Sequence, residues 1–115
     1  MGLPLPLIAS TICLDFWLYG IYDPLVITYN EAKRQANIVK HSIDLAALSG
    51  FFDGDLLTRE DASAAYGELR FQSIGWFAGE MLFVVWTPGD GEWPHIISAR
   101  KAERHEREAW TRFCK

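Results

Sequence analysis

Cysteine is scarce in this chain of 115 residues. The two that are present, Cys13 and Cys114, lie in the first segment and near the C-terminal end, so no disulfide framework is implied and a reducing cytoplasm is suitable. No pair of cysteines or histidines has the spacing of metal ligands, which disfavours zinc. A Ser-His-Asp arrangement and a phosphate-binding glycine loop are also lacking. These absences exclude most familiar enzyme classes of this size, and we expect no metal and no cofactor.

A membrane-spanning run is also missing. Residues 1–25 are apolar, but they contain no Lys or Arg, are interrupted by Pro4 and Pro6, and reach Asp15 before a bilayer-spanning length accumulates. We therefore predict no signal peptide, no transmembrane helix and a cytoplasmic protein without stable membrane association. Because the composition changes sharply afterwards, residues 1–25 are interpreted as an N-terminal extension and residues 26–115 as one globular domain. The alternative is that the first segment adds a packed strand or helix.

Positive charge is in the minority, with 11 Lys and Arg against 15 Asp and Glu. This balance does not by itself favour nucleic-acid binding, because phosphate contacts need cations. The distribution is uneven, however: residues 42–92 are strongly acidic, whereas cations outnumber acids in residues 26–41 and 93–115. If the fold joins the two basic blocks, they form an anion site, and the acidic middle can meet a basic partner. The alternative is that the charges form solvated helix faces.

The first regular elements are a short β-type run over 26–29 and a helix over 31–41. Asn30 is a good N-cap, and EAKRQANIVKH contains neither Gly nor Pro. At about 100° per residue, the apolar side chains form one stripe, which we expect to pack: Ala32, Ala36, Val39 and Ile43. The polar side chains gather opposite it and are expected to be available for chemistry: Lys33, Asn37, Lys40 and His41.

The remaining pattern predicts an α+β fold. Residues 43–52 form a second short helix that ends at Gly50, and residues 53–66 form a loop with one short strand. Three β-type runs follow as an antiparallel meander, over 68–77, 80–87 and 94–99, with strong turn signals between them. The C-terminal segment, ARKAERHEREAWTRF, is a strong helix former. We therefore expect two N-terminal helices, an antiparallel sheet of about four strands and a C-terminal helix.

Three segments together resemble one known family. They are YNEAKRQANIVKHSI, ELRFQSIGWFAGEMLFVVWT and HIISARKAERHERE, which follow one another in the order and spacing that the family has. The family is BrnT, the toxin half of a bacterial type II toxin-antitoxin pair. The matching positions that carry chemistry are Lys33, Asn37, Lys40, His41, Arg70, Arg100, Glu106 and Arg107. The sequence departs from the family pattern at Asn30, Ser42, His95 and Trp110.

The resemblance implies a fold similar to the RelE-type ribonucleases. It also implies an endoribonuclease that cleaves RNA without a metal and inhibits translation. The implied partner is a BrnA-like antitoxin of the ribbon-helix-helix class, bound as a hetero-oligomer, with DNA contacted only through the antitoxin.

The chemistry of such an enzyme needs few groups. RNA carries its own nucleophile, the 2′-OH, so the enzyme must orient the phosphodiester, move two protons and neutralise charge on the pentavalent phosphate. Arg100 and Arg70 are the candidates for the phosphate, because a planar guanidinium can bond two nonbridging oxygens at once. The candidates for holding the rest of the RNA are Lys33, Lys40, Asn37 and Arg107.

Two candidates remain for the acid-base role. His41 is one, because histidine exchanges protons near neutral pH. Glu106, among apolar neighbours, is either a base with a raised pKa or a buried ion-pair partner of Arg70 or Arg100. For each cation the alternative is a structural ion pair with the acidic middle.

Two other functions stay open. One is a catalytically weak protein that acts mainly within an antitoxin-containing complex repressing its own operon, and the departures at His95 and Trp110 favour it. The other is a small membrane-associated protein anchored by its apolar first segment.

Overall fold

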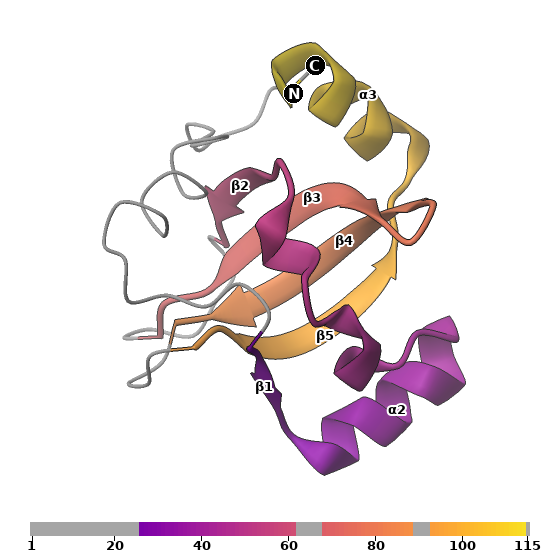
Figure 1. The fold of residues 1–115 in the computed structure, drawn as a ribbon, viewed down its shortest axis with the longest axis vertical. Helices are drawn as coiled ribbons and strands as arrows, with labels where there is room; N and C mark the ends of the chain where they lie inside the picture. The colour runs from indigo at the N-terminus through magenta and orange to yellow at the C-terminus, as the bar shows by residue number, and fades with distance from the viewer. Residues whose placement is uncertain (1–25, 62–67, 89–92, 115) are drawn as a thin grey trace.

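The computed structural model describes residues 26–61, 68–88 and 93–114 (Figure 1). In chain order the elements are β1 (Thr28–Tyr29), α2 (Glu31–His41), the 3-10 helices η1 (Leu45–Leu48) and η2 (Phe51–Asp53), β2 (Leu57–Glu60), β3 (Phe71–Phe77), β4 (Glu80–Thr87), β5 (His95–Lys101) and α3 (Arg104–Cys114). The expected α+β class is confirmed. Residues 1–25, interpreted above as an extension, lie outside the described residues. No helix within the described part of the chain is both long and apolar enough to cross a membrane.

The strands form one five-stranded mixed sheet in the order β1-β5-β4-β3-β2. Strands β2 to β5 pair antiparallel, as the meander predicts, and β3 and β4 are joined by the expected turn at Ala78 and Gly79, both with positive φ. The fifth strand, β1, pairs parallel to β5. The expectation of an antiparallel sheet of about four strands is therefore corrected to a mixed sheet of five.

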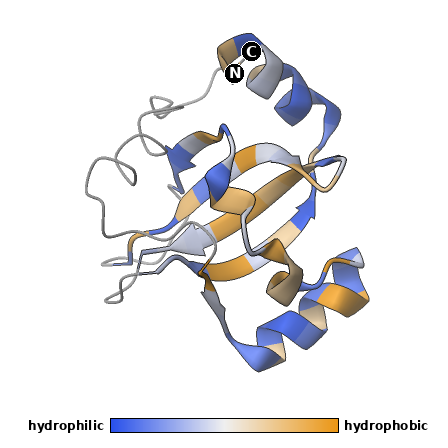
Figure 2. Cartoon of the chain, viewed as in Figure 1, coloured by the Kyte–Doolittle hydropathy of each residue, from blue (hydrophilic) through white to orange (hydrophobic). Residues whose placement is uncertain are grey.

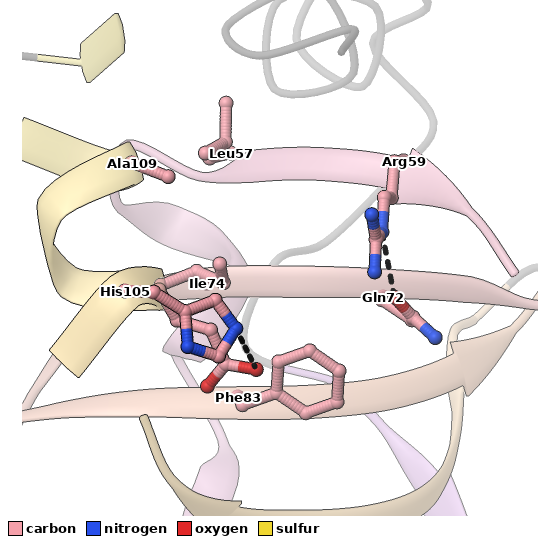
Figure 3. A pocket seen from close by; sticks show the side chains of 8 residues that line it. Leu57, Arg59, Gln72, Ile74, Phe83, His105 and Ala109 are labelled. Atoms are coloured by element: carbon pink, nitrogen blue, oxygen red, sulfur yellow. Dashed lines mark hydrogen bonds and ion pairs between the residues drawn. The ribbon is translucent and has the colours of Figure 1, made fainter. Parts of the chain in front are cut away.

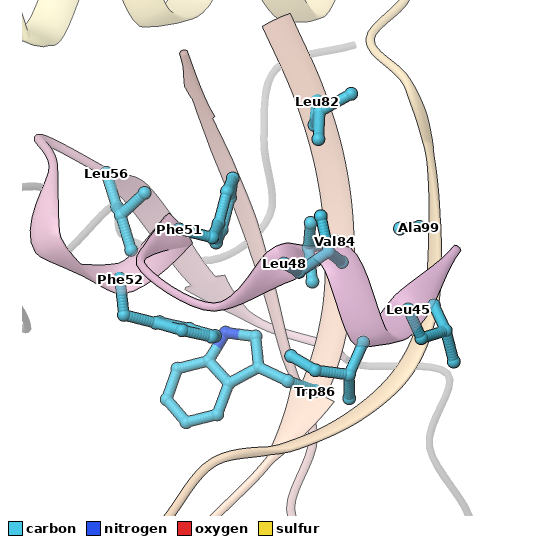
Figure 4. Close-up of a cluster of buried hydrophobic side chains, with 10 residues drawn as sticks. Leu45, Leu48, Phe51, Phe52, Leu56, Leu82, Val84, Trp86 and Ala99 are labelled. Carbon is cyan, nitrogen blue, oxygen red and sulfur yellow. The ribbon is translucent and has the colours of Figure 1, made fainter. Parts of the chain in front are cut away.

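Alternating side chains of β4 build a core on each face of the sheet. Leu82, Val84 and Trp86 point toward η1 and η2, where Phe51 and Phe52 enter the core, each 1% exposed (Figure 4). Met81 packs on the opposite face with residues of β2, β3 and α3. Figure 2 shows the same division, with apolar residues in the sheet and hydrophilic residues along much of α2 and α3.

Helix α2 begins where predicted but packs through the opposite face. Asn30 caps it, accepting a hydrogen bond from the Lys33 N–H at 3.0 Å. The buried side chain is Asn37, 5% exposed, whereas Val39 is 86% exposed. The expectation that Asn37 is available to RNA is therefore wrong. The physical reason is that Ala32 and Ala36 of the apolar stripe offer little area to bury, while the Asn37 amide satisfies backbone groups inside the protein. Ile43, the last member of the stripe, packs against the core as expected.

The Asn37 side chain makes three hydrogen bonds, two of which tie α2 to the sheet. Its Nδ2 donates to the carbonyls of Ile43 at 2.8 Å and Ala99 at 2.9 Å, and its Oδ1 accepts from the Ala99 N–H at 3.0 Å. One side chain thus holds the end of α2, the segment after it and the middle of β5 in one arrangement.

Two other boundaries differ from the expectation. Residues 43–52 form two separate 3-10 turns instead of one helix, because Gly50 adopts φ 93° between them. The C-terminal helix begins at Arg104, because β5 continues through Lys101, paired with Leu82 of β4. Arg100 is therefore a strand residue opposite Phe83, and the expectation that it starts a helix is wrong.

Candidate functional site

The sheet face opposite η1 and η2, called here the open face, is covered by α3 only at one end. Side chains two residues apart on a strand point to the same face of the sheet. The register between neighbouring strands then aligns the side chains of this face in rows that run across the strands. The first row holds Leu57, Ile74, Phe83 and Arg100. The second row holds Arg59, Gln72, Val85 and Ser98. The third row holds Thr87 and His95, and Arg70, which immediately precedes β3, lines the same hollow as these two residues.

The rows place the two predicted phosphate ligands on one surface. Arg100 lies two rows away from the third row, beside which Arg70 lies, and this separation corresponds to about 13 Å along the strands. Neither the helix pattern nor the charge pattern of the sequence predicts that Arg70 and Arg100 share a surface, because their positions depend on the pairing of three strands.

Arg100 is held in the first row by a two-pronged ion pair with Glu106. Nη1 and Nη2 of Arg100 donate to the two Glu106 carboxylate oxygens at 2.9 and 2.8 Å, and Nη1 also donates to the Lys101 carbonyl. The guanidinium carbon lies 4.0 Å from the centre of the Phe83 ring. Of the five N–H donors that a guanidinium carries, these contacts use the two on Nη1 and one on Nη2. The edge formed by Nε–H and the second Nη2–H makes no hydrogen bond within the described residues.

Glu106 is an anion in this arrangement. Burial raises the pKa of its carboxyl, but hydrogen bonds from Arg100 and from the Glu103 backbone N–H outweigh that effect, and the pKa lies below its usual value. The alternative in which Glu106 is a base with a raised pKa is therefore wrong. Of the partners considered for it, the structure pairs it with Arg100 and not with Arg70.

The low pKa of Glu106 predicts a pH-dependent contribution to stability. Its folded-state pKa is below its unfolded-state pKa, so the contribution is complete above about pH 4.3 and is lost as the pH falls through the folded value. Glu106→Gln should cost about 1–3 kcal/mol at neutral pH and flatten the acid limb of the stability curve. Urea unfolding between about pH 3 and pH 7 measures both effects.

Glu108→Gln is the matched control for that series. Glu108 also pairs with an arginine, Arg104, but its side chain is 60% exposed. This replacement should change stability by less than about 1 kcal/mol. An equal acid dependence in Glu106→Gln and in the parent protein would contradict the low pKa.

Glu103, His105 and Glu106 each present one ligand atom within 4.8 Å of the others. This set differs from the sequence expectation, in which no metal-ligand group was found. Both Glu106 oxygens are already bonded to Arg100, and one of them also accepts from the Glu103 N–H. A cation bound here would have to displace Arg100 from Glu106. The donor set is thus better suited to holding an arginine than a metal.

A second group of predicted residues meets in the third row. An open hollow of about 430 Å³ is lined by residues of β4, β5, the segment before β3 and the start of α2: Asn30, Ala32, Lys33, Glu68, Arg70, Thr87, His95, Ile96 and Ile97. Arg70 Nε lies 3.2 Å from the Glu68 carboxylate. His95 Nδ1 lies 2.8 Å from Thr28 Oγ1, across the β1-β5 pair. The structure therefore brings Lys33 and Arg70 together, and His95, a departure from the family pattern, lies with them.

Three other predicted residues lie elsewhere in the described structure. Lys40 and His41 end α2 and line neither hollow of the open face. Arg107 donates to the Ala102 carbonyl at 2.9 Å and lies with Arg104 on the outer surface of α3.

The open face also contains residues that sequence reasoning missed. Arg59, Gln72, Phe83 and His105 line a hollow beside Glu106 (Figure 3). His105 Nε2 lies 4.0 Å from a Glu106 oxygen. Its position on α3, one residue before Glu106, was the available signal. Arg59 gave no such signal, because its place depends on the β2-β3 register.

Comparison with known proteins identifies the fold that carries these groups. Residues 29–106 match the family model described as the ribonuclease toxin, BrnT, of type II toxin-antitoxin systems. The chain belongs to the BrnT family. A crystal structure of the BrnT ribonuclease toxin of Brucella abortus is similar, with 32% sequence identity and a TM-score of 0.52 over 68% of this chain and 96% of that one. No curated protein matches. The resemblance seen in the sequence is confirmed, and membership of a type II family implies an antitoxin partner for this BrnT protein.

Proposed function

We propose that this BrnT protein is a metal-independent endoribonuclease that cleaves RNA on the open face and inhibits translation. The observation that carries the proposal is the edge of Arg100 that bears two N–H donors unengaged within the described residues, while Glu106 and Phe83 hold its guanidinium in place. Two parallel N–H groups match two nonbridging oxygens of one phosphate.

The proposed reaction uses the RNA's own nucleophile. The 2′ oxygen forms a bond to phosphorus, the bond from phosphorus to the 5′ oxygen breaks, and the products are a 2′,3′-cyclic phosphate and a 5′-OH. Arg100 stabilises the negative charge that develops on the nonbridging oxygens. Glu106 is a positioning residue, because it fixes the plane of the Arg100 guanidinium without contacting the phosphate.

His105 is the proposed acid-base group, in place of His41. It lies in the same hollow as Glu106, and its side chain is 74% exposed, so it is accessible to take the proton of the 2′-OH. The leaving 5′ oxygen, on the opposite side of phosphorus, takes its proton from water. Glu106 does not suit this role, because it is an anion whose two oxygens are already bonded.

Lys33 and Arg70 are proposed to hold the RNA backbone in the second hollow, together with His95. The distance of about 13 Å between the rows then defines the path of the RNA across the open face. Lys40, His41 and Arg107 are not part of this proposed site. The proposed partner is a BrnA-like antitoxin of the ribbon-helix-helix class, which forms a hetero-oligomer with the toxin in the cytoplasm and supplies the contacts to DNA.

Incubation of the purified full chain with RNA in the presence of EDTA tests the proposal. We expect cleavage at an undiminished rate, because no step uses a metal, and we expect the antitoxin to stop it. Intact RNA in the presence of folded toxin would favour the catalytically weak binding partner. Cleavage that disappears with EDTA and returns with a divalent cation would contradict the metal-independent mechanism.

A further inference from the structure

Arg59 and Gln72 form a cross-strand pair in the second row of the open face. They lie opposite each other on β2 and β3, and Arg59 Nε donates to Gln72 Oε1 at 2.8 Å (Figure 3). This hydrogen bond fixes the plane of the guanidinium and the orientation of the Gln72 amide at the same time. The pair borders the hollow that also contains His105 and Glu106.

The pair presents only donors to the hollow. Within the described residues, Nη1 and Nη2 of Arg59 have no hydrogen bond or ion pair, and Gln72 uses its oxygen for Arg59, which leaves its Nε2 as a donor. Arg59 differs in this respect from Arg70 and Arg100, which both pair with a carboxylate. A ligand that binds Arg59 and Gln72 must therefore carry hydrogen-bond acceptors, at least two of them side by side.

The walls of the hollow indicate which acceptor group fits. They are largely apolar: Leu57, Ile74, Phe83 and Ala109. The space is about 50 Å³, enough for the edge of one planar ring. A phosphate between these side chains would lose hydration, whereas the faces of a nucleobase are apolar and suit them. The scissile phosphate is assigned to Arg100, which does not line this hollow.

We propose that Arg59 and Gln72 read a guanine next to the scissile phosphate. Guanine presents two adjacent acceptors, O6 and N7, and arginine bonds both at once. Adenine presents N7 beside an N–H donor, which would face the donors of Arg59, and uracil presents a single acceptor on the equivalent edge. Cytosine also presents two adjacent acceptors, O2 and N3, so an RNA with central cytosine that binds as tightly as the same RNA with central guanine would overturn the assignment to guanine. The inference deepens the proposed ribonuclease function and rests on it for its biological meaning, but the base preference is measurable without cleavage.

The test is the binding of the full-length protein to uncleavable RNA. The probes are fluorescent uridine pentamers, 2′-O-methylated throughout, with guanine, adenine, cytosine or 7-deazaguanine at the centre, followed by anisotropy. We expect the guanine pentamer to bind roughly tenfold or more tightly than the adenine pentamer, and 7-deazaguanine, which lacks the N7 acceptor, to lose most of this advantage. The methylated 2′ oxygen cannot attack phosphorus, so a failure of catalysis does not affect the result.

Three variants distinguish base reading from phosphate binding. Arg59→Lys keeps the positive charge but not the two-pronged geometry, and should retain general affinity while losing the preference for guanine. Gln72→Ala should weaken the preference by releasing Arg59, and Arg104→Lys, on the outer surface of α3, should behave like the parent. Equal binding of guanine and adenine by the parent, or an unchanged guanine preference in Arg59→Lys, would overturn the proposal. A loss in Arg59→Lys that is equal for every base would assign Arg59 to the phosphate instead.

Discussion

Arg100→Lys is expected to lower the rate of RNA cleavage by about two to three orders of magnitude. A lysine can still pair with Glu106, so the fold should persist, but a single ammonium group cannot reproduce the two parallel donors of the Nε and Nη2 edge. Arg100→Ala should lose at least as much activity and also some stability, because it leaves the Glu106 anion, whose side chain is 9% exposed, without its partner. Single-turnover cleavage assays and urea unfolding separate these two effects.

Arg104→Lys is the control for this pair of variants. Arg104 is also an arginine paired with a glutamate, Glu108, but it is 85% exposed and lies on the outer surface of α3. The Arg104→Lys protein should cleave RNA at the rate of the parent protein. Parental cleavage by a folded Arg100→Lys protein would show that Arg100 acts only as a structural partner of Glu106.

Asn37→Ala is expected to have the largest effect on folding, with a loss of about 3 kcal/mol or more. The replacement leaves the Ala99 N–H and the carbonyls of Ala99 and Ile43 without their present partner. Such a loss is a large part of the total stability of a typical domain. Asn37→Asp should be comparably damaging, because it keeps the acceptor but places negative charge against two carbonyl oxygens. Urea denaturation followed by tryptophan fluorescence measures the loss.

Val39→Ala is the informative control on the same helix. Val39 belongs to the apolar stripe that the sequence pattern predicts to be packed, yet it is 86% exposed. Its replacement should change stability by no more than about 0.5 kcal/mol. A larger loss for Val39→Ala than for Asn37→Ala would contradict the packing of α2 described above.

The parts of the fold that were predictable depend on local signals. Asn30 caps α2 through a residue three positions away, and the turn at Ala78 and Gly79 specifies the β3-β4 hairpin. The errors arose where distant contacts decide the outcome. Asn37 is buried because of Ala99, 62 residues further along the chain. The segment after Ala99 has a strong helical pattern, but pairing with β4 keeps Arg100 and Lys101 in a strand.

The candidate site, like the fold, was predictable from the sequence only in part. The family resemblance pointed to Arg70, Arg100 and Glu106, and the ion pair between the last two was one of the alternatives for the carboxylate. His41 is the histidine that matches the family pattern and exchanges protons near neutral pH, whereas it is His105 that shares the hollow with Glu106. Arg59 and Gln72 could not be paired from the sequence, because a shift of one residue in the β2-β3 register would place them on opposite faces of the sheet.

The chemical ends of the RNA fragments test the central claim most directly. Fragments made by the purified protein in EDTA are analysed by mass spectrometry, which distinguishes the two possible kinds of cleavage. Attack by the 2′-OH predicts a 2′,3′-cyclic phosphate or its hydrolysed 3′-phosphate on one fragment and a 5′-OH on the other. A 2′-deoxy nucleotide on the 5′ side of the cleaved bond should abolish cutting there. A 3′-OH with a 5′-phosphate, or unchanged cutting at the 2′-deoxy position, would contradict the mechanism proposed for Arg100 and the open face.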